Sequence, residues 1–237
     1  MTPIDVQVVS WLDGFALRWP LLDKAVVFCA NGMIAKGTFM ALFVWVPWAS
    51  DSDRTRRNRE IVFATIMAAF GALAIGLLIQ KLVPFRVRPM DNPALHFVRP
   101  AGQTPIENWP SSFPSDHAIL FAAMATGCWF MSRRLGIAAH LFALAFIGLP
   151  RIYVGFHYPT DLLGGAALGI LGGVIANEGR VRAVLSAMPM RWTQRYPGIM
   201  TAALFVISVQ ISSVFWEIRF IVSEGLKLLG FHVRVLY

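Results

Sequence analysis

The stretch "IVFATIMAAFGALAIGLLIQ", residues 61–80, decides the class of fold to which this chain belongs. None of its side chains is charged, and almost all of them are apolar. About 20 apolar residues are what an α-helix needs to cross the hydrocarbon core of a bilayer. The segment therefore predicts a membrane-spanning helix.

The composition of the whole chain agrees with this prediction. Of its 237 residues, 57% are hydrophobic and only 14% are charged. The mean hydropathy of +0.60 lies above the range of a soluble globular domain. The length suits one domain of about six spanning helices, at roughly 20 residues each plus loops. We expect an all-α integral membrane protein whose single domain occupies residues 1–237.

Five more segments of the chain are apolar enough to predict spans. They are residues 24–48, 117–131, 136–149, 159–176 and 198–216. Lys36 interrupts the first of these segments, so that crossing can begin near Met33. Residues 4–19 are amphipathic and too polar to span, and we expect them to form a helix that lies in the membrane interface.

Arginines are concentrated in the loops that follow the first, third and fifth predicted spans. They are Arg54, Arg56, Arg57, Arg59, Arg133, Arg134, Arg180, Arg182, Arg191 and Arg195. The positive-inside rule makes these three loops cytoplasmic, so the loops after the second and fourth spans face outward. The net charge of +8 then reflects cytoplasmic arginines and anionic lipid, and we expect no nucleic acid as a partner.

Two polar motifs lie in the first outward loop. It opens with "KLVPFRVRP", residues 81–89, where Lys81 and Arg88 follow the end of a spanning helix. Taken alone, these cations can be residues that snorkel to the interface. The loop ends with "FPSDHA", residues 113–118. Taken alone, Ser115 or the aspartate after it is best interpreted as the cap of the next helix, because Ser and Asp are common caps.

The second outward loop contains "RIYVGFHYPTD", residues 151–161. Pro159 marks the first turn of a predicted span, so His157 stands just before that helix. Asp161 follows four residues later, an offset that lets a carboxylate fix the tautomer of the imidazole and leave its other nitrogen free. A lone histidine here can be structural, whereas one with an aspartate and with Arg151 six residues before it indicates a site.

The three motifs are expected to meet at the outer face of the membrane. Two of them lie at helix N-termini, where unpaired N–H groups and the helix dipole favour an anion. Lys81, Arg88 and Arg151 can hold the oxygens of a phosphoryl group without a metal. These loops contain no carboxylate cluster typical of Mg²⁺ or Zn²⁺ ligands, so we expect no metal and no cofactor. Of His117 and His157, one can attack phosphorus while the other protonates the leaving oxygen.

Together the motifs resemble the three-part signature of the type 2 phosphatidic acid phosphatase superfamily, K-x6-RP, PSGH and SR-x5-H-x3-D. All the spacings fit over residues 81–161. Two positions depart from the signature, since Asp116 stands in place of Gly and Pro150 in place of Ser. Pro150 removes one phosphate donor, and Asp116 adds a carboxylate beside an anion site, which is costly unless it points away or serves a distinct leaving group.

Asp116 also indicates a subfamily. "FPSDH" and "RIYVGFHYPTDLLGG" resemble bacterial undecaprenyl-diphosphate phosphatases of the bacitracin-resistance type, and so does "WLDGFALRWPLLDKAVVF" near the N-terminus. This likeness covers most of the first 175 residues. Residues 178–237, a basic loop and the last predicted span, carry no recognised likeness.

The resemblance implies a two-step mechanism on a lipid phosphate in the bacterial inner membrane, at a site that faces the periplasm. His157, oriented by Asp161, attacks the terminal phosphorus, while His117 protonates the departing lipid phosphate and later activates water. The groups that hold the transferred phosphoryl are Lys81, Arg88, Ser115, Arg151 and a backbone N–H near Asp116. No cofactor takes part, and the oligomeric state is not predicted.

Several alternatives use the same residues. A phosphatidic acid, phosphatidylglycerophosphate or lipid A phosphatase would need no other site. A lipid transporter or flippase is a different class, but transporters are typically built from repeats with polar groups near the midplane. No internal repeat occurs here, and the polar groups cluster at one membrane face, which favours an enzyme.

Other residues carry open interpretations. Arg86 and Arg99 can be solvated surface residues or can bind a second phosphate or a headgroup. Lys36 can snorkel, or it can reach the face of the membrane that carries the site, since cations inside a membrane are functional candidates. Adjacent side chains are expected to point in different directions, so we expect no Ser-Asp-His relay within "FPSDHA". The glycines of one helical row should let a neighbouring helix pack closely: Gly165, Gly169 and Gly173.

Overall fold

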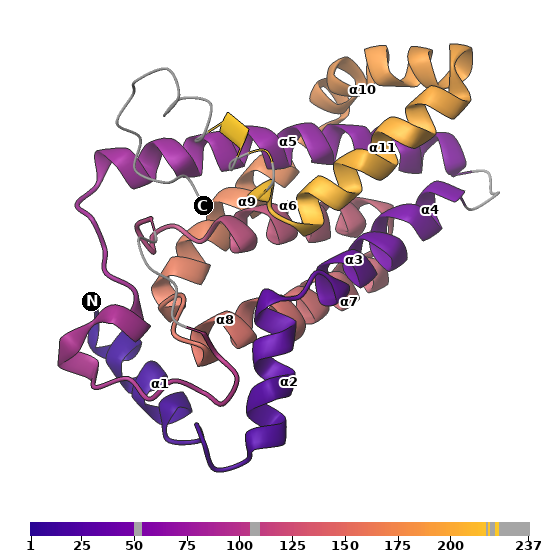
Figure 1. Cartoon of the computed structure of the whole chain (residues 1–237). Helices are drawn as coiled ribbons and strands as arrows, with labels where there is room; N and C mark the ends of the chain where they lie inside the picture. The colour runs from indigo at the N-terminus through magenta and orange to yellow at the C-terminus, as the bar shows by residue number, and fades with distance from the viewer. Residues whose placement is uncertain (50–53, 105–109, 217, 219–220, 223–237) are drawn as a thin grey trace.

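The computed structural model describes residues 1–49, 54–104, 110–216, 218, 221 and 222. Over these ranges the regular structure is helical and contains no strand, which confirms the predicted all-α class (Figure 1). The α-helices are α1 (Pro3–Asp13), α2 (Pro20–Asn31), α3 (Ile34–Met40), α4 (Val46–Ala49), α5 (Thr55–Leu82), α6 (Asp116–Met131), α7 (Arg133–Phe142), α8 (Leu149–Tyr153), α9 (Pro159–Asn177), α10 (Gly179–Arg195) and α11 (Pro197–Ser212). The π-helical segment η1 (Ala41–Trp45) joins α3 to α4, and η4 (Ala143–Gly148) joins α7 to α8. The 3₁₀ turns η2 (Pro89–Asp91) and η3 (Pro93–Leu95) lie in the loop between α5 and α6.

Three of these helices are long and apolar enough to cross a membrane: α5, the continuous helix Arg133–Tyr153, and α9. A fourth crossing results if α2 and the helix that starts at Ile34 count as one span, although this pair is bent by 53°. The helices α6 and α11 have 16 residues each and are shorter than the roughly 20 residues of a typical span. Within the described residues, six spans are therefore not confirmed.

The ends of the chain differ from the sequence prediction in two places. The helix expected over residues 4–19 ends at Asp13, and a turn with Leu17 in the left-handed region (φ 64°) leads into α2. The basic stretch that follows α9 forms the helix α10. The last residues of the unrecognised segment 178–237 lie outside the described part of the chain.

The glycine row of α9 determines how the centre of the bundle is built. A Cβ atom at Gly165 would lie 2.4 Å from the backbone oxygen of Ser115, and one at Gly169 would lie 2.2 Å from that of Ile119. Only glycine allows backbones this close, so α6 and α9 touch along their length, which confirms the predicted packing role. This contact places the N-termini of α6 and α9, and the motifs that precede them, side by side.

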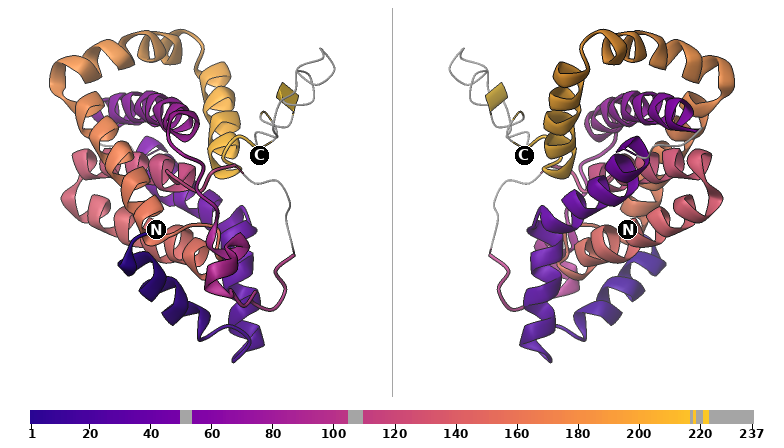
Figure 2. Two further views of the ribbon diagram at one scale, coloured as in Figure 1. Left: turned by 90° about the vertical axis from the view of Figure 1, so that its left-hand side faces the viewer. Right: turned by 90° about the vertical axis from the view of Figure 1, so that its right-hand side faces the viewer.

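The long helix α5 packs against α6 and α9 and also against α10, which in turn contacts α11. Figures 1 and 2 show α10 and α11 on one side of the bundle, with α1 and α2 on the opposite side. Inside the bundle, Asn177 of α9 donates from Nδ2 to Oγ1 of Thr65 on α5, at 3.0 Å. This buried bond fixes the far end of α9 against α5.

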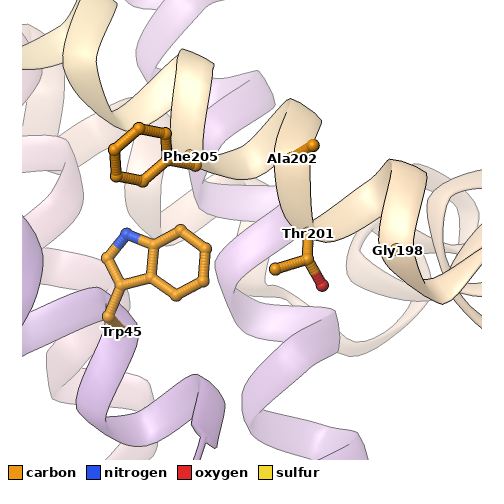
Figure 3. Close-up of a pocket in the computed structure, with 5 residues that line it drawn as sticks. All are labelled: Trp45, Gly198, Thr201, Ala202 and Phe205. Atoms are coloured by element: carbon orange, nitrogen blue, oxygen red, sulfur yellow. The ribbon is translucent and has the colours of Figure 1, made fainter.

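An apolar groove separates η1 from α11. Trp45 and Phe205 lie on opposite walls of a cavity of about 740 Å³, which Gly198, Thr201 and Ala202 also line (Figure 3). The Nε1 of Trp45 donates to Oγ of Ser208 at 3.1 Å, which ties the two walls together.

The N-terminal helices cover the loops that carry the motifs. Val9 of α1 packs with Ile152, Tyr158 and Leu162, and Val27 and Ala30 of α2 pack in a second apolar cluster with Met90 and Phe156. In Figure 1, α1, α8 and the loop that contains η2 and η3 lie together at the lower left. The motifs are thus enclosed between the helix N-termini of the bundle and this N-terminal cover.

Candidate active site

The third motif folds into a buried turn between α8 and α9. Gly155 adopts φ 72°, and a Cβ atom there would lie 2.9 Å from Cβ of Met90, so both the conformation and the space require glycine. The backbone N–H groups of Phe156 and His157 both donate to the carbonyl of Arg151, at 2.9 and 3.3 Å. The turn therefore holds His157 and Arg151 in a fixed relationship.

His157 presents one imidazole nitrogen that has no hydrogen-bond partner among the described residues. The residue is 1% exposed, and its Nδ1 lies 2.9 Å from the carbonyl oxygen of Ser112. A carbonyl oxygen only accepts, so Nδ1 carries the hydrogen and Nε2 carries a lone pair. Nε2 is buried and has no hydrogen-bond partner among the described residues. Burial lowers the pKa of His157 to about 4, Asp161 opposes this shift, and Arg88 and Arg151 add to it, so the ring is neutral at pH 7.

Asp161 makes its direct bonds elsewhere. Its Oδ2 accepts from the backbone N–H of Tyr158 at 2.7 Å, and its Oδ1 accepts from Nη1 of Arg86 in a close ion pair. The distance from Oδ2 to Nδ1 of His157 is 3.8 Å, beyond hydrogen-bond range. The carbonyl of Ser112, and not Asp161 as expected, is therefore the hydrogen-bond acceptor that fixes the tautomer of His157. No feature of residue type in the sequence points to this backbone group.

Arg86 is neither a solvated surface residue nor a free phosphate site, which corrects both interpretations of the sequence. Its Nη2 donates to Oδ2 of Asp5 at 2.6 Å, and its Nη1 donates to Oγ1 of Thr160 at 2.8 Å as well as to Asp161. The guanidinium also lies over the ring of Tyr158, 4.4 Å from its centroid. Arg86 thus joins α1 to the first turn of α9.

Arg99, in contrast, is a partly exposed residue whose Nη2 lies 3.7 Å from Oδ1 of Asp91. This arrangement agrees with the surface interpretation of Arg99.

Ser115 combines the two roles that the sequence left open, because it caps a helix within the cluster of motifs. The buried hydroxyl accepts from the N–H of Ala118 at 3.4 Å, and the hydroxyl hydrogen remains available to a ligand. The backbone N–H of Ser115 donates to the carbonyl of Asp161 at 3.1 Å. The second and third motifs are therefore bonded directly to each other.

Asp116 and His117 contact each other, although we expected adjacent side chains to point apart. Oδ1 of Asp116 accepts from the backbone N–H of His117 at 3.0 Å and lies 3.2 Å from its Nδ1. In the neutral ring, Nδ1 donates to the carboxylate, and Nε2 is left to exchange a proton with a ligand. The carboxylate that departs from the family signature thus orients the second histidine.

Two buried arginines lie next to these histidines. Nη1 of Arg88 donates to the carbonyl of Phe156 at 2.8 Å, and Nη1 of Arg151 donates to the carbonyl of Ala30 at 3.1 Å. Burial lowers the pKa of Arg88 to about 10, and Asp116 is the main group that opposes this shift, so Arg88 keeps its charge at pH 7. Nε of Arg151 is buried without a hydrogen-bond partner in the described ranges. Such an unpaired donor fits an anion-binding site.

The two lysines considered from the sequence occupy different places. Lys81 is exposed at the end of α5, and the structure gives it no hydrogen bond or ion pair within its described residues. That Lys81 helps to hold the transferred phosphoryl group stays a prediction. Lys36 of α3 is buried, and it interacts electrostatically with Arg151 and Asp116. Of the two lysines, it is therefore Lys36 that the structure brings close to the charged residues of the motifs.

Metal ligands do not gather at this site. Among the residues that the structure describes, no three His, Cys, Asp or Glu side chains form a group that would hold an ion. Cys29 is partly buried, Cys128 is buried, and both are free thiols. The metal-free mechanism itself stays a prediction.

A family model gives the first comparison with known proteins. The model described as the PAP2 superfamily matches residues 59–183, which contain all three motifs. No solved structure gives a significant match to this chain.

Curated relatives cover most of the same region. Undecaprenyl-diphosphatase BcrC of Bacillus subtilis is 28% identical over 73% of this chain and 82% of its own length. The bacitracin transport permease protein BcrC of Bacillus licheniformis is 29% identical over 71% of this chain and 76% of its own. Decaprenylphosphoryl-5-phosphoribose phosphatase of Mycobacterium tuberculosis is 39% identical over 54% of this chain and 67% of its own.

Proposed function

This chain belongs to the PAP2 superfamily, and from that premise we propose that it is a membrane phosphatase that removes the terminal phosphate of a polyprenyl diphosphate. The observation that carries the proposal is the buried, unpartnered Nε2 of His157 beside Arg88 and Arg151. A neutral imidazole with one free lone pair is a nucleophile, and two fixed cations complement the oxygens of a phosphoryl group.

In the first step, Nε2 of His157 forms a bond to the terminal phosphorus while the bond from phosphorus to the bridging oxygen breaks. The electron pair of that bond passes to the bridging oxygen, which takes a proton from Nε2 of His117 and leaves as the lipid monophosphate. His117 must therefore be protonated as substrate binds, and its neighbour Asp116 stabilises that imidazolium. The products of this step are phosphohistidine and the polyprenyl phosphate.

In the second step, water attacks the phosphohistidine. Nε2 of His117 takes a proton from the water, the bond between phosphorus and nitrogen breaks, and its electron pair returns to His157. Inorganic phosphate then leaves, and both histidines regain their starting states. Arg88, Arg151 and Ser115 hold the phosphoryl oxygens in both steps, because their positions are fixed by buried backbone contacts.

The substrate class follows from the relatives. Two of the three described above are named for removing phosphate from polyprenyl-linked compounds, undecaprenyl diphosphate in one case and decaprenylphosphoryl-5-phosphoribose in the other. The higher identity to the second makes a polyprenylphosphoryl sugar phosphate the second candidate substrate. A transport role is supported here only by the name of the permease relative.

We place the protein in the bacterial inner membrane with the site on the periplasmic side. The arginine-rich segments lie at the start of α5, at the start of α7 and in α10. These places are at the opposite ends of α5, α6 and α9 from the motifs, as the positive-inside rule requires for a site on the periplasmic side. The test is the Lys81→Cys variant of a protein from which the native cysteines have been removed. A membrane-impermeant maleimide should label this variant from the outside of intact cells. Labelling only after lysis would contradict this orientation.

The test of the function is phosphate release by the purified protein. We expect undecaprenyl diphosphate to be the best substrate in a panel with a decaprenylphosphoryl sugar phosphate, phosphatidic acid, phosphatidylglycerophosphate and lipid A. The His157→Ala variant should be inactive while remaining monodisperse in detergent, and activity should survive EDTA. Turnover by His157→Ala near that of the wild type would refute the assignment of the nucleophile, and a strict Mg²⁺ requirement would refute metal independence.

A further inference from the structure

Lys36 is a buried cation that the proposed mechanism does not use. It lies in the first turn of α3, directly after the bend that separates α2 from α3. The residue is 5% exposed, and the described part of the chain offers it no hydrogen bond and no ion pair. A buried charge without a hydrogen bond or an ion pair is destabilising, because its lost hydration is not replaced. A function that repays this cost is therefore expected.

The bend before Lys36 is attached to the candidate site. Arg151 donates from Nη1 to the carbonyl of Ala30, in the last turn of α2. Ala30 also packs in the same apolar cluster as Phe156. The backbone that carries Lys36 is therefore held in place by a motif residue. This fixed position argues against a lysine that simply snorkels to the membrane surface.

The buried charges at the site do not balance. Lys36, Arg88 and Arg151 are three buried cations. Asp91 also interacts with Arg88 but lies near Arg99, and Asp161 shares the single charge of Arg86 with Asp5. With Arg86 included, four positive charges stand against the three negative charges of Asp5, Asp116 and Asp161. The cluster therefore carries a positive surplus, which suits an anionic ligand.

The cations also differ in which histidine they face. His157 interacts electrostatically with Arg88 and Arg151, and His117 interacts with Arg151 and Lys36. Arg151 is thus shared, Arg88 lies on the side of the nucleophile, and Lys36 lies on the side of the residue that protonates the leaving oxygen. The leaving group of a diphosphate ester is itself a phosphate, and it departs on that side.

We propose that Lys36 binds the second phosphate of a diphosphate ester, the one that leaves with the lipid, while Arg88 and Arg151 hold the phosphoryl group that is transferred. This inference rests on the proposed function. When the bridging bond breaks, its electron pair moves onto an oxygen of the leaving phosphate, where the ammonium of Lys36 stabilises the new charge. The leaving group of a monoester such as phosphatidic acid is an alcohol, which has no phosphate for Lys36 to bind. Lys36 therefore determines the preference for diphosphates.

The surroundings of Lys36 agree with this role. Its neighbours Met33, Gly37 and Met40 line an apolar cavity of about 270 Å³ between α3 and α11, which shares Trp45 and Phe205 with the groove in Figure 3. The residues next to Lys36 in α3 thus line an apolar surface, while Lys36 itself interacts electrostatically with His117. A phosphate held by Lys36 would have its attached lipid chain next to that surface.

The test is the Lys36→Met variant, with Lys24→Met as the matched control. Lys24 is an exposed lysine of the same bent helix pair, outside the charge cluster. Isothermal titration of the purified protein with inorganic pyrophosphate and with inorganic phosphate reports binding without turnover. Because a hydrogen bond to a charged group is lost, Lys36→Met should weaken pyrophosphate binding about 10- to 100-fold and change phosphate binding by less than about threefold. Lys24→Met should bind both ions as the wild type does.

The same variants should separate substrates in turnover. Lys36→Met should lower kcat/KM for undecaprenyl diphosphate by a similar factor and leave any hydrolysis of phosphatidic acid nearly unchanged. Equal losses for pyrophosphate and phosphate, no loss for either, or no pyrophosphate binding by the wild type would overturn the inference. A wild type that releases phosphate from no lipid instead refutes the proposed function. If Lys36→Met does not fold, Lys36→Gln is held to the same outcomes.

Discussion

Oδ1 of Asp116 lies 3.2 Å from Nδ1 of His117, the residue that follows it in the chain. The same oxygen accepts the backbone N–H of His117, so the carboxylate is fixed to the first turn of α6 and cannot swing away. This contact gives Asp116 a role in the proposed mechanism, although a carboxylate beside a phosphate site is electrostatically costly. In that mechanism Asp116 holds the tautomer of His117 and stabilises the imidazolium that protonates the leaving group.

We predict that Asp116→Asn lowers kcat about 10- to 100-fold, because the protonated form of His117 loses its charge partner while the fold keeps a side chain of the same shape. KM should stay equal or fall, since the cation cluster loses its opposing charge. Steady-state kinetics on undecaprenyl diphosphate measures both constants. Asp91→Asn, which alters a partly exposed carboxylate paired with Arg99, is the control and should behave as the wild type. A raised KM with unchanged kcat would exclude this positioning role.

The sequence predicted the chemical groups of this site better than their contacts. Motif spacing identified the two histidines, Arg88, Ser115 and Arg151, because each type of side chain is chemically distinctive. The contact that fixes His157 comes from a backbone carbonyl 45 residues away, and a carbonyl belongs to every residue. Spacing therefore carries no signal for it.

The pairing of Arg86 with Asp5 was likewise beyond prediction, since 81 residues separate the two and both lie in segments that look like solvated surface. The six predicted spans are not confirmed for a different reason. Hydropathy recognises the apolar run of α6, but it does not give the length of the helix, which at 16 residues is shorter than a typical span.

The pKa of His157 predicts how the stability of the protein depends on pH. Its folded value of about 4 lies below the ordinary value of 6.5, because burial disfavours the charged ring. On acidification the unfolded chain therefore binds the proton first, so stability that is complete above pH 6.5 is lost as the pH falls toward about 4. The loss should reach roughly 3 kcal/mol. Thermal unfolding between pH 4 and pH 7 measures it.

The His157→Gln variant is the control for this pH dependence, because it lacks the titrating ring. Its unfolding temperature should fall less than that of the wild type over the same interval. Parallel curves for the two proteins would show that His157 is not buried in its neutral form.

Asp5 should be as important for stability as any residue of the bundle. Burial acts to raise its pKa, but hydrogen bonds from Thr2 and Thr160 outweigh burial and lower the pKa, so the carboxylate is ionised and pairs with Arg86. Asp5→Ala leaves a partly buried arginine with one partner fewer. We expect the unfolding temperature to fall by roughly 6–20 °C, because breaking a buried pair costs about 3–5 kcal/mol.

The control for Asp5→Ala is Asp13→Ala, at the other end of α1. Asp13 accepts one backbone bond, from Val98 at 2.9 Å, and has no ion pair among the described residues. Its loss should lower the unfolding temperature by no more than about 2 °C. Equal effects of the two substitutions would mean that Asp5 does not fasten α1 to α9.

The contact between α6 and α9 should control both stability and catalysis, because these helices carry the two histidine motifs at their N-termini. In Gly169→Ala, the new methyl group would lie 2.2 Å from the backbone oxygen of Ile119 and 2.9 Å from the backbone nitrogen of Ala123. Backbone atoms cannot turn aside, so the helices must separate, at a cost of about 1–3 kcal/mol or more. The rate of phosphate release should fall even under conditions in which the variant stays folded, since His117 and His157 move apart. Gly71→Ala is the control, because a Cβ atom there meets nothing within 4 Å, and it should be neutral or stabilise α5 by about 0.5–1 kcal/mol. An active, stable Gly169→Ala variant would show that the glycine row does not set the geometry of the site.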